Sequence, residues 1–284
     1  MAQFNKILVA VDGSEASRNA LRQSFKLALD EKKWITVVAI DPPYQGDLSL
    51  VGVSNISEVL KGPGEKNLEE ARHIAETENA SIKTRLEEGE PFQKIAEVAE
   101  EERCELIVMG RRGMSGIERA LMGSVTSKVI GYFEGKTLVV PEDTPLGWKT
   151  ILVATDGSKF SDAAIDEATD YAKSYGGSLK IVNVVYTNDE FLANAPDVVE
   201  KMVDKAKTGL NAVMDKAKKE GVDTEVFVRE GEPYQIIVNL AKELNVDTIV
   251  MGSHRRSGIK RIFMGSVTSM VIGHAPCPVM VVNK

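Results

Sequence analysis

The chain has 284 residues, of which 43% are hydrophobic and 27% charged, and its formal net charge is −7. That length suits about two ordinary domains of a soluble globular protein, and the acidic charge, without a basic block, argues against nucleic acid or a membrane surface as a partner. No stretch approaches the ~20 apolar residues of a membrane span and the N-terminus has no signal-peptide pattern, so we expect a cytoplasmic protein.

The predicted elements of the first half alternate between strand and helix. The first, Ile7–Val11, is a continuous apolar run with β-branched residues, which is typical of a buried parallel strand. Ser14 follows it as a candidate helix N-cap. The later elements are, in chain order, a helix to about Ala28, a strand at Ile35–Ile40, an irregular Gly- and Pro-bearing stretch at Asp41–Gly64, a charged helix at about Lys66–Asn79, a strand at Ser81–Leu86, a helix at Pro91–Glu102, a strand at Leu106–Met109, a helix at Ser124–Tyr132 and a strand at Thr137–Val140.

The second half repeats the first. Ile-Leu-Val-Ala-Val-Asp-Gly-Ser at 7–14 returns with one change at 151–158, and Met-Gly-Ser-Val-Thr-Ser at 122–127 returns unchanged at 264–269. An offset of 142 to 144 residues indicates a duplicated domain rather than a solenoid. Pro141, Pro145 and Gly147 interrupt the pattern between the copies, so we predict domains at 1–143 and 144–284. The strands predicted in the second copy are Ile151–Thr155, Leu179–Val185, Thr224–Val228, Thr248–Met251 and Val279–Val282.

Alternating strands and helices predict the α/β class, with two tandem doubly wound domains. Right-handed crossovers leave few topologies, and we predict in each domain a five-stranded parallel sheet of order 3-2-1-4-5. Ligands of such sheets bind at the carboxyl ends of the strands where the order reverses, which here is the crevice between strands 1 and 4.

Two features of the first copy fall at that crevice. Asp12 follows strand 1, and Gly110 follows strand 4, where it opens a skeleton of Gly, two residues, Gly113, nine residues and Gly123-Ser124. Gly110 and Gly113 would allow positive φ and a close approach to phosphate. Gly123-Ser124 opens a helix whose N–H groups and dipole suit an anion. Together these features suggest a site for a phosphorylated nucleoside, with Asp12 accepting a hydrogen bond on the nucleoside side.

The same residues also have a purely structural interpretation. Glycines after a strand are often turn residues, and Gly-Ser before a helix is often only a cap. Asp12 alone could equally be an ordinary turn residue. The glycine skeleton by itself therefore leaves phosphate binding and simple turn formation both open.

The motifs at 7–14, 110–124 and 265–269, with His274-Ala-Pro-Cys-Pro-Val279 after them, resemble those of the universal stress protein family, and the resemblance covers nearly the whole chain twice. It implies an adenine nucleotide alpha hydrolase-like fold and, for members with the glycine skeleton, ATP binding, with Mg²⁺ held largely by the phosphates. In the first copy it implies phosphate contacts from Gly110, Gly113, Gly123, Ser124 and the backbone of Val125, and nucleoside contacts from Ala10, Asp12 and the backbone near Ala39.

The second copy departs from the skeleton, because Arg255 replaces its middle glycine. Two outcomes stay open: Arg255 blocks or weakens the site, or its guanidinium contacts phosphate directly. The residues that would line this second site are Ala154, Asp156, Val184, Gly252, Gly265, Ser266 and Val267.

Three functions are compatible with this sequence: an ATP-binding stress-response regulator, a slow ATPase, and a scaffold that binds no nucleotide. The first is favoured, because the sequence has no Gly-x4-Gly-Lys-Ser/Thr loop and no Gly-x-Ser-x-Gly elbow. We therefore expect a protein that is not an enzyme, although slow hydrolysis stays open. The resemblance also implies a homodimer of the tandem chain, whereas the sequence identifies neither the protein partners nor the stress.

Overall fold

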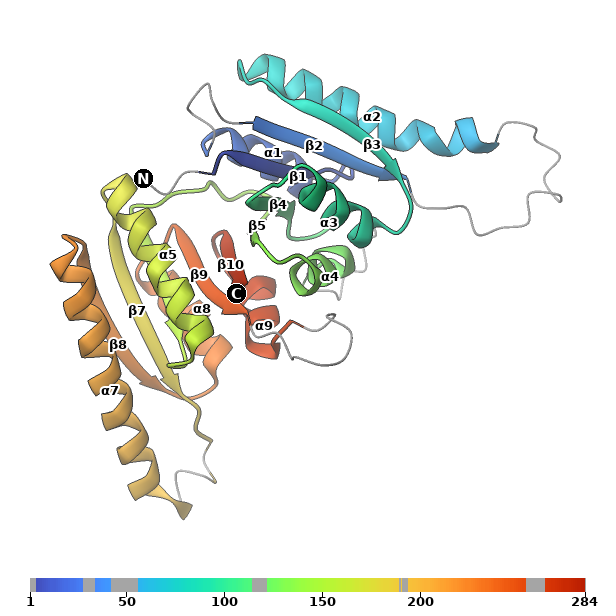
Figure 1. Cartoon of the computed structure of the whole chain (residues 1–284). Coiled ribbons are helices and arrows are strands. Elements are labelled where there is room, and N and C mark those ends of the chain that lie inside the picture. The colour runs from blue at the N-terminus through green and yellow to red at the C-terminus, as the bar shows by residue number, and fades with distance from the viewer. Residues whose placement is uncertain are drawn as a thin grey trace. The chain divides into compact units, whose positions relative to one another are not determined.

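The computed structural model of the chain describes residues 4–27, 34–41, 56–113, 122–188, 190, 194–253 and 264–283. The chain divides into two compact units, one formed by Phe4–Asp143 and the other containing Thr144–Lys284. Each unit is an α/β domain built around its own parallel strands, with helices packed against them (Figure 1).

Five parallel strands form the sheet of the first domain. They are β1 (Lys6–Ala10), β2 (Trp34–Asp41), β3 (Lys83–Glu88), β4 (Leu106–Gly110) and β5 (Lys136–Val140). Their order is β3-β2-β1-β4-β5, and each neighbouring pair is parallel, which confirms the predicted order 3-2-1-4-5. The order reverses between β1 and β4, so the carboxyl ends of these two strands flank the crevice at which ligands of such sheets bind.

Helices cover both faces of this sheet. They are α1 (Glu15–Phe25), α2 (Ile56–Thr77), α3 (Pro91–Glu101) and α4 (Ser124–Tyr132). Leu8, Val38 and Ile107 pack with Phe92 and Ile95 on the face covered by α3 and α4 (Figure 1). Successive strand residues point to opposite faces, so their neighbours lie beneath α1 and α2. Each fully buried aliphatic side chain contributes about 1.5–3 kcal/mol to this core.

The second domain repeats the arrangement. Its strands are β6 (Thr150–Thr155), β7 (Ser178–Val185), β8 (Asp223–Glu230), β9 (Thr248–Ser253) and β10 (Val279–Asn283), and its helices are α5 (Lys159–Tyr175), α7 (Pro196–Lys219), α8 (Pro233–Glu243) and α9 (Ser266–His274). The strand order β8-β7-β6-β9-β10, again with parallel neighbours, corresponds to 3-2-1-4-5 within the copy. The duplication that the sequence shows is therefore also a duplication of fold.

Helix α2 begins earlier than the sequence indicates, because Gly62, Pro63 and Gly64 lie inside it rather than in an irregular stretch. Gly64 has a packing reason: its N–H donates to the Asp41 Oδ1 atom at 3.0 Å, and a Cβ at this position would lie 2.5 Å from the Leu86 Cδ1 atom. The missing side chain therefore lets α2 approach β2 and β3 closely. The rest of the predicted irregular stretch, residues 42–55, lies outside the described residues.

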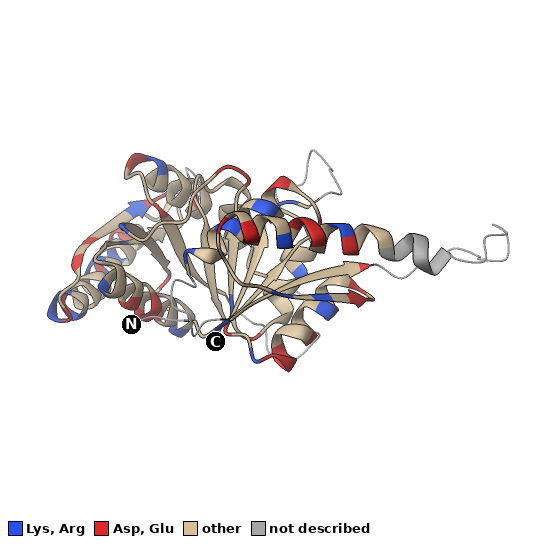
Figure 2. Ribbon diagram, turned by 90° about the horizontal axis from the view of Figure 1, so that it is seen from above, with Lys and Arg blue, Asp and Glu red and all other residues tan. Residues whose placement is uncertain are grey.

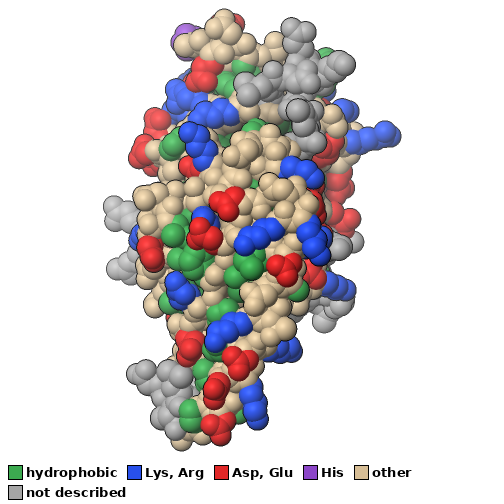
Figure 3. All heavy atoms as spheres, turned by 90° about the vertical axis from the view of Figure 1, so that its left-hand side faces the viewer, with side chains coloured by type: hydrophobic (Ala, Val, Ile, Leu, Met, Phe, Trp, Pro, Cys, Tyr) green, Lys and Arg blue, Asp and Glu red, His purple; other side chains and the backbone are tan. Residues whose placement is uncertain are grey.

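Charged side chains of both signs are interspersed. Basic and acidic residues alternate along the described part of α2 (Figure 2), and they are mixed on the face shown in Figure 3. Among the helices that the structure describes, none combines the length and the apolarity needed to cross a membrane.

Candidate nucleotide site

The residues predicted to bind nucleotide in the first copy lie at the carboxyl ends of β1, β2 and β4 and at the start of α4. Ala10 and Gly110 end their strands, Asp12 follows β1, Ala39 lies near the end of β2, Gly113 follows β4, Gly123 is the N-cap of α4, and Ser124 and Val125 open that helix. The structure thus brings the predicted residues to one end of the sheet, although their role in binding stays a prediction.

Asp12 is held beside the loop that follows β4. Its Oδ1 atom accepts hydrogen bonds from the Ser14 N–H at 3.1 Å and from the Ser14 hydroxyl at 2.6 Å. A Cβ added to Gly113 would lie 2.2 Å from the Asp12 Oδ2 atom, so the main chain of the loop passes close to this carboxylate. Asp12 is exposed just beyond the carboxyl end of β1.

The start of α4 is not capped by a side chain within the described part of the chain. Its N-cap is Gly123, and no side chain caps the helix, whereas α1 and α5 are capped by Ser14 and Ser158. The intrahelical hydrogen bonds begin with the Ser127 N–H, which donates to the Gly123 carbonyl at 3.1 Å. The N–H groups of the three residues before Ser127 precede these bonds, and together with the positive end of the helix dipole they suit an anion.

The prediction of positive φ at Gly110 and Gly113 is wrong, because φ is not positive at either of these glycines. Gly110 is instead required by packing. A Cβ there would lie 2.7 Å from the Ala16 carbonyl carbon and 2.8 Å from the Ser17 nitrogen, in the first turn of α1. Positive φ occurs at Gly13, at 80°, which turns the chain from β1 into α1. Gly110 therefore allows β4 and the start of α1 to approach closely, and Gly113 allows the loop to approach the Asp12 carboxylate, and neither glycine adopts a left-handed conformation.

Three of the predicted residues could contact a ligand mainly through the main chain. The side chain of Ala39 is only 1% exposed, and Ala10, at 9%, belongs to the core cluster beneath α3 and α4. Val125 packs its side chain against the same cluster. These side chains pack into or against the core, so the main chain is the part of each residue that a ligand could reach; the contacts that the resemblance implies for Ala39 and Val125 stay a prediction.

The second copy reproduces part of this geometry. Asp156 follows β6 and accepts a hydrogen bond from the Ser158 N–H at 3.0 Å, and a Cβ on Gly252 would lie 2.4 Å from the Phe160 carbonyl oxygen. The other predicted residues are Ala154 in β6, Val184 in β7, Gly265 as the N-cap of α9, and Ser266 and Val267 in its first turn. Arg255 lies outside the described residues, so its two possible effects stay open.

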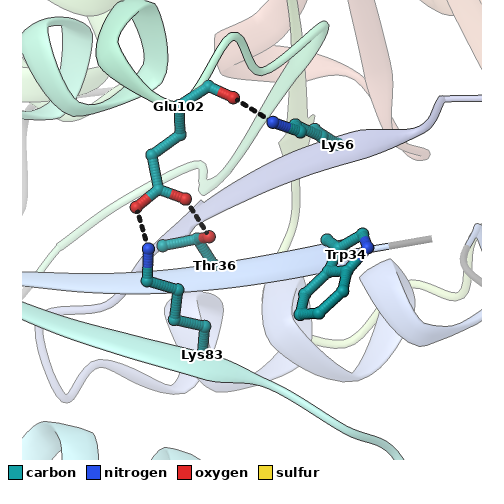
Figure 4. Close-up of a pocket in the computed structure, with 5 residues that line it drawn as sticks. All are labelled: Lys6, Trp34, Thr36, Lys83 and Glu102. Carbon is teal, nitrogen blue, oxygen red and sulfur yellow. Dashed lines mark hydrogen bonds and ion pairs between the residues drawn. The ribbon is translucent and has the colours of Figure 1, made fainter. Parts of the chain in front are cut away.

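A pocket of about 290 Å³ lies at the opposite end of the first sheet, lined by Lys6, Trp34, Thr36, Lys83 and Glu102 (Figure 4). Its polar groups bond to one another. The Glu102 carboxylate accepts from Lys83 and from Thr36, both at 2.7 Å, and the Lys6 ammonium donates to the Glu102 carbonyl at 3.0 Å. Lysines beside the last carbonyls of a helix stabilise it, so this cluster closes the C-terminus of α3.

Glu102 should make the first domain sensitive to acid. Burial raises the pKa of its carboxyl, but the bonds from Lys83, Thr36 and Arg85 outweigh burial and hold the pKa below its ordinary value of 4.5. The stability that the ionised carboxylate contributes is therefore present above pH ~4.5 and is lost as the pH falls further. Glu102→Gln should lower the free energy of unfolding at neutral pH by about 1–2 kcal/mol.

Denaturant unfolding between pH 3 and pH 7 measures this effect. Glu101→Gln is the control, because Glu101 is 61% exposed and its ion pair with Arg85 is solvated. It should change stability by less than about 0.5 kcal/mol. A Glu102→Gln protein as stable as the wild type at neutral pH would show that the ionised Glu102 carboxylate does not stabilise the domain.

Comparison with known proteins identifies the family of this fold. The sequence matches a protein-family model, described as the universal stress protein family, at residues 3–141 and again at residues 147–283. Universal stress protein MJ0531 of Methanocaldococcus jannaschii is 36% identical over 144 residues, which cover 48% of this chain and 82% of that protein. The crystal structure of a universal stress protein from Archaeoglobus fulgidus shares the fold, with a TM-score of 0.74, 24% identity, and coverage of 99% of this chain and 96% of that one.

The chain therefore belongs to the universal stress protein family, with the family domain present twice. The resemblance inferred from the sequence motifs is confirmed. Another universal stress protein, solved in complex with cAMP, is 27% identical, with a TM-score of 0.39 and coverage of 49% of this chain and 98% of that one.

Proposed function

We propose that the first domain binds ATP, and that the protein acts as a stress-response regulator through nucleotide-dependent conformation or partner binding. The observation that carries this proposal is the uncapped start of α4 beside Asp12. Backbone donors suited to a triphosphate and a carboxylate suited to a nucleoside hydroxyl or amine lie at the same end of one sheet.

The main chain between these two groups supports the proposal. The Gly123 N–H donates to the Arg111 carbonyl at 2.9 Å, and the Thr126 hydroxyl donates to the Gly110 carbonyl at 3.1 Å. These bonds fix the start of α4 against the end of β4. Among the described residues, the atom nearest to a Cβ on Gly123 would be the Thr126 Oγ1 atom at 3.5 Å, so this glycine fills no tight contact with them. Backbone N–H groups fixed in this way are suited to donate to the oxygens of a phosphate group.

Magnesium, when bound, would neutralise the charge of the triphosphate. In the proposed site the protein's own contribution is the N–H groups at the start of α4 and the Ser124 hydroxyl, which donate to phosphate oxygens. Asp12 would accept from the nucleoside. The metal would accordingly be held mainly through the phosphates.

We propose binding rather than turnover, because the donors at α4 stabilise bound phosphate and Asp12 is assigned to the nucleoside. Slow ATP hydrolysis and a scaffold without a ligand are the alternatives. Hydrolysis would need a base that positions water at the terminal phosphate. Protein partners and a homodimer of the tandem chain stay predictions from the sequence.

Calorimetric titration of the full chain with MgATP tests the proposal, and Asp12→Asn is the first variant to compare. We expect ATP affinity to fall about tenfold, or about 1.4 kcal/mol, because the amide oxygen is a weaker acceptor than the carboxylate. Asp156→Asn in the same assay reports whether the second copy contributes a site.

Three outcomes separate the three functions. ATP that binds and is recovered intact supports the regulator. Steady release of phosphate that Asp12→Asn abolishes supports the ATPase. A wild-type chain that shows no binding heat and carries no nucleotide through native purification supports the scaffold and overturns the proposal.

A further inference from the structure

The Ser14 hydroxyl lies between the two parts of the proposed site. It donates to the Asp12 Oδ1 atom at 2.6 Å, and it is 3.3 Å from the carbonyl oxygen of Arg112, in the loop that follows β4. It also accepts a hydrogen bond from the Ser17 N–H at 3.2 Å as the N-cap of α1. One hydroxyl therefore contacts the carboxylate, the loop and the first turn of a helix.

These contacts determine how the Asp12 carboxylate is oriented. The Ser14 N–H and the Ser14 hydroxyl both donate to the Asp12 Oδ1 atom, and the Asp12 Oδ2 atom faces Gly113. A carboxylate held by two donors on one oxygen loses its freedom to rotate, so the direction of Oδ2 is set before any ligand arrives. Preorganisation of this kind raises affinity because less ordering remains to be done on binding.

The second copy separates this role from helix capping. Ser158 caps α5 as Ser14 caps α1, accepting from the Ser161 N–H at 3.4 Å, and its N–H donates to Asp156 at 3.0 Å. Within the part of the chain that the structure describes, the Ser158 hydroxyl makes the capping contact only. Among the described residues, the contact of its hydroxyl with the carboxylate distinguishes Ser14 from Ser158; residue 254, the counterpart of Arg112, lies outside them.

We propose that Ser14 is a positioning residue of the first copy. Its hydroxyl links the Asp12 carboxylate to the main chain of the loop that follows β4. The proposal rests on the proposed ATP binding and specifies how that site is built. Ser14 couples the nucleoside side to the triphosphate side, so losing its hydroxyl lowers ATP affinity by more than losing a helix cap would.

The test compares Ser14→Gly with Ser158→Gly in the full chain, by MgATP titration and by thermal unfolding without ligand. Glycine is accepted at an N-cap at a cost of only a few tenths of a kcal/mol, so both variants should fold and lose similar, small amounts of stability. Ser14→Gly should bind ATP about tenfold more weakly, whereas Ser158→Gly should stay within twofold of the wild type. Ser14→Thr keeps the hydroxyl and the cap, and should restore affinity to within threefold.

Equal ATP affinities in the wild type, Ser14→Gly and Ser158→Gly would overturn this inference and leave the proposed function standing. Equal losses in both glycine variants would assign the effect to capping and also overturn it. A wild-type chain that binds no ATP would overturn both. If Ser14→Gly fails to fold, Ser14→Asp takes its place, because aspartate caps a helix but cannot donate, and it should show a loss of tenfold or more.

Discussion

Gly123→Val should reduce the ATP affinity of the first domain at least 100-fold, or about 2.7 kcal/mol, while leaving the domain folded. Valine at this N-cap would fill the space in front of the first N–H groups of α4, where the phosphate is proposed to lie. The backbone accepts the substitution, because φ is −61° and ψ is 142°, and the nearest atom to an added Cβ is the Thr126 Oγ1 atom at 3.5 Å. Calorimetric titration with MgATP measures the loss.

Circular dichroism and the thermal midpoint without ligand are the controls for folding, since valine is a poorer N-cap than glycine and costs about 1 kcal/mol. Gly265→Val places the same change at the start of α9, where φ is −57° and ψ is 144°. It reports separately on the second copy. A folded Gly123→Val chain with unchanged ATP affinity would remove the start of α4 from the site.

Gly110→Ala should lower the free energy of unfolding of the first domain by about 2–3 kcal/mol. The added Cβ would lie 2.7–2.8 Å from backbone atoms of Ala16 and Ser17, which cannot rotate away as a side chain could. Gly252→Ala should destabilise the second domain similarly, because its Cβ would lie 2.4 Å from the Phe160 carbonyl oxygen. Denaturant unfolding of each variant measures the loss.

Gly209→Ala is the matched control for this change. Gly209 is exposed in the interior of α7, and a Cβ there would lie more than 4 Å from every other described residue apart from its own neighbours in the helix. The same substitution should therefore stabilise the chain by about 0.5–1 kcal/mol, since alanine favours the helix. If Gly110→Ala and Gly209→Ala had the same sign, the packing explanation for Gly110 would be wrong.

The sequence predicts much of the fold, because strand burial and duplication leave strong local patterns. The run from Ile7 to Val11 is apolar throughout since β1 lies between two neighbouring strands and two helical layers. Helix α2 shows where local patterns fail. Glycine disfavours helices, yet Gly64 lies inside α2. Its N–H donates to Asp41, and this close contact leaves no room for a side chain.

The candidate site is predicted less completely than the fold. The sequence places the glycine skeleton and Asp12 at one end of a sheet, but it attributes the glycines to positive φ, whereas Gly110 is explained by contact with α1. The bridging position of Ser14 could not be inferred, because it depends on the distance to the Arg112 carbonyl across 98 residues of chain. Its only signal in the sequence was the motif Asp-Gly-Ser, which occurs in both copies.

The contact between Asp41 and Gly64 also bears on how this domain tolerates changes of length. It joins the end of β2 to α2 through a side chain that is only 5% exposed, and so fixes both ends of the segment between them. The entropy of closing a loop grows only slowly with the number of residues in it, by about 0.6 kcal/mol for each doubling. Natural or engineered insertions between Asp41 and Ile56, ahead of α2, should therefore have little effect on folding as long as this contact is kept, which makes this a place to fuse a reporter.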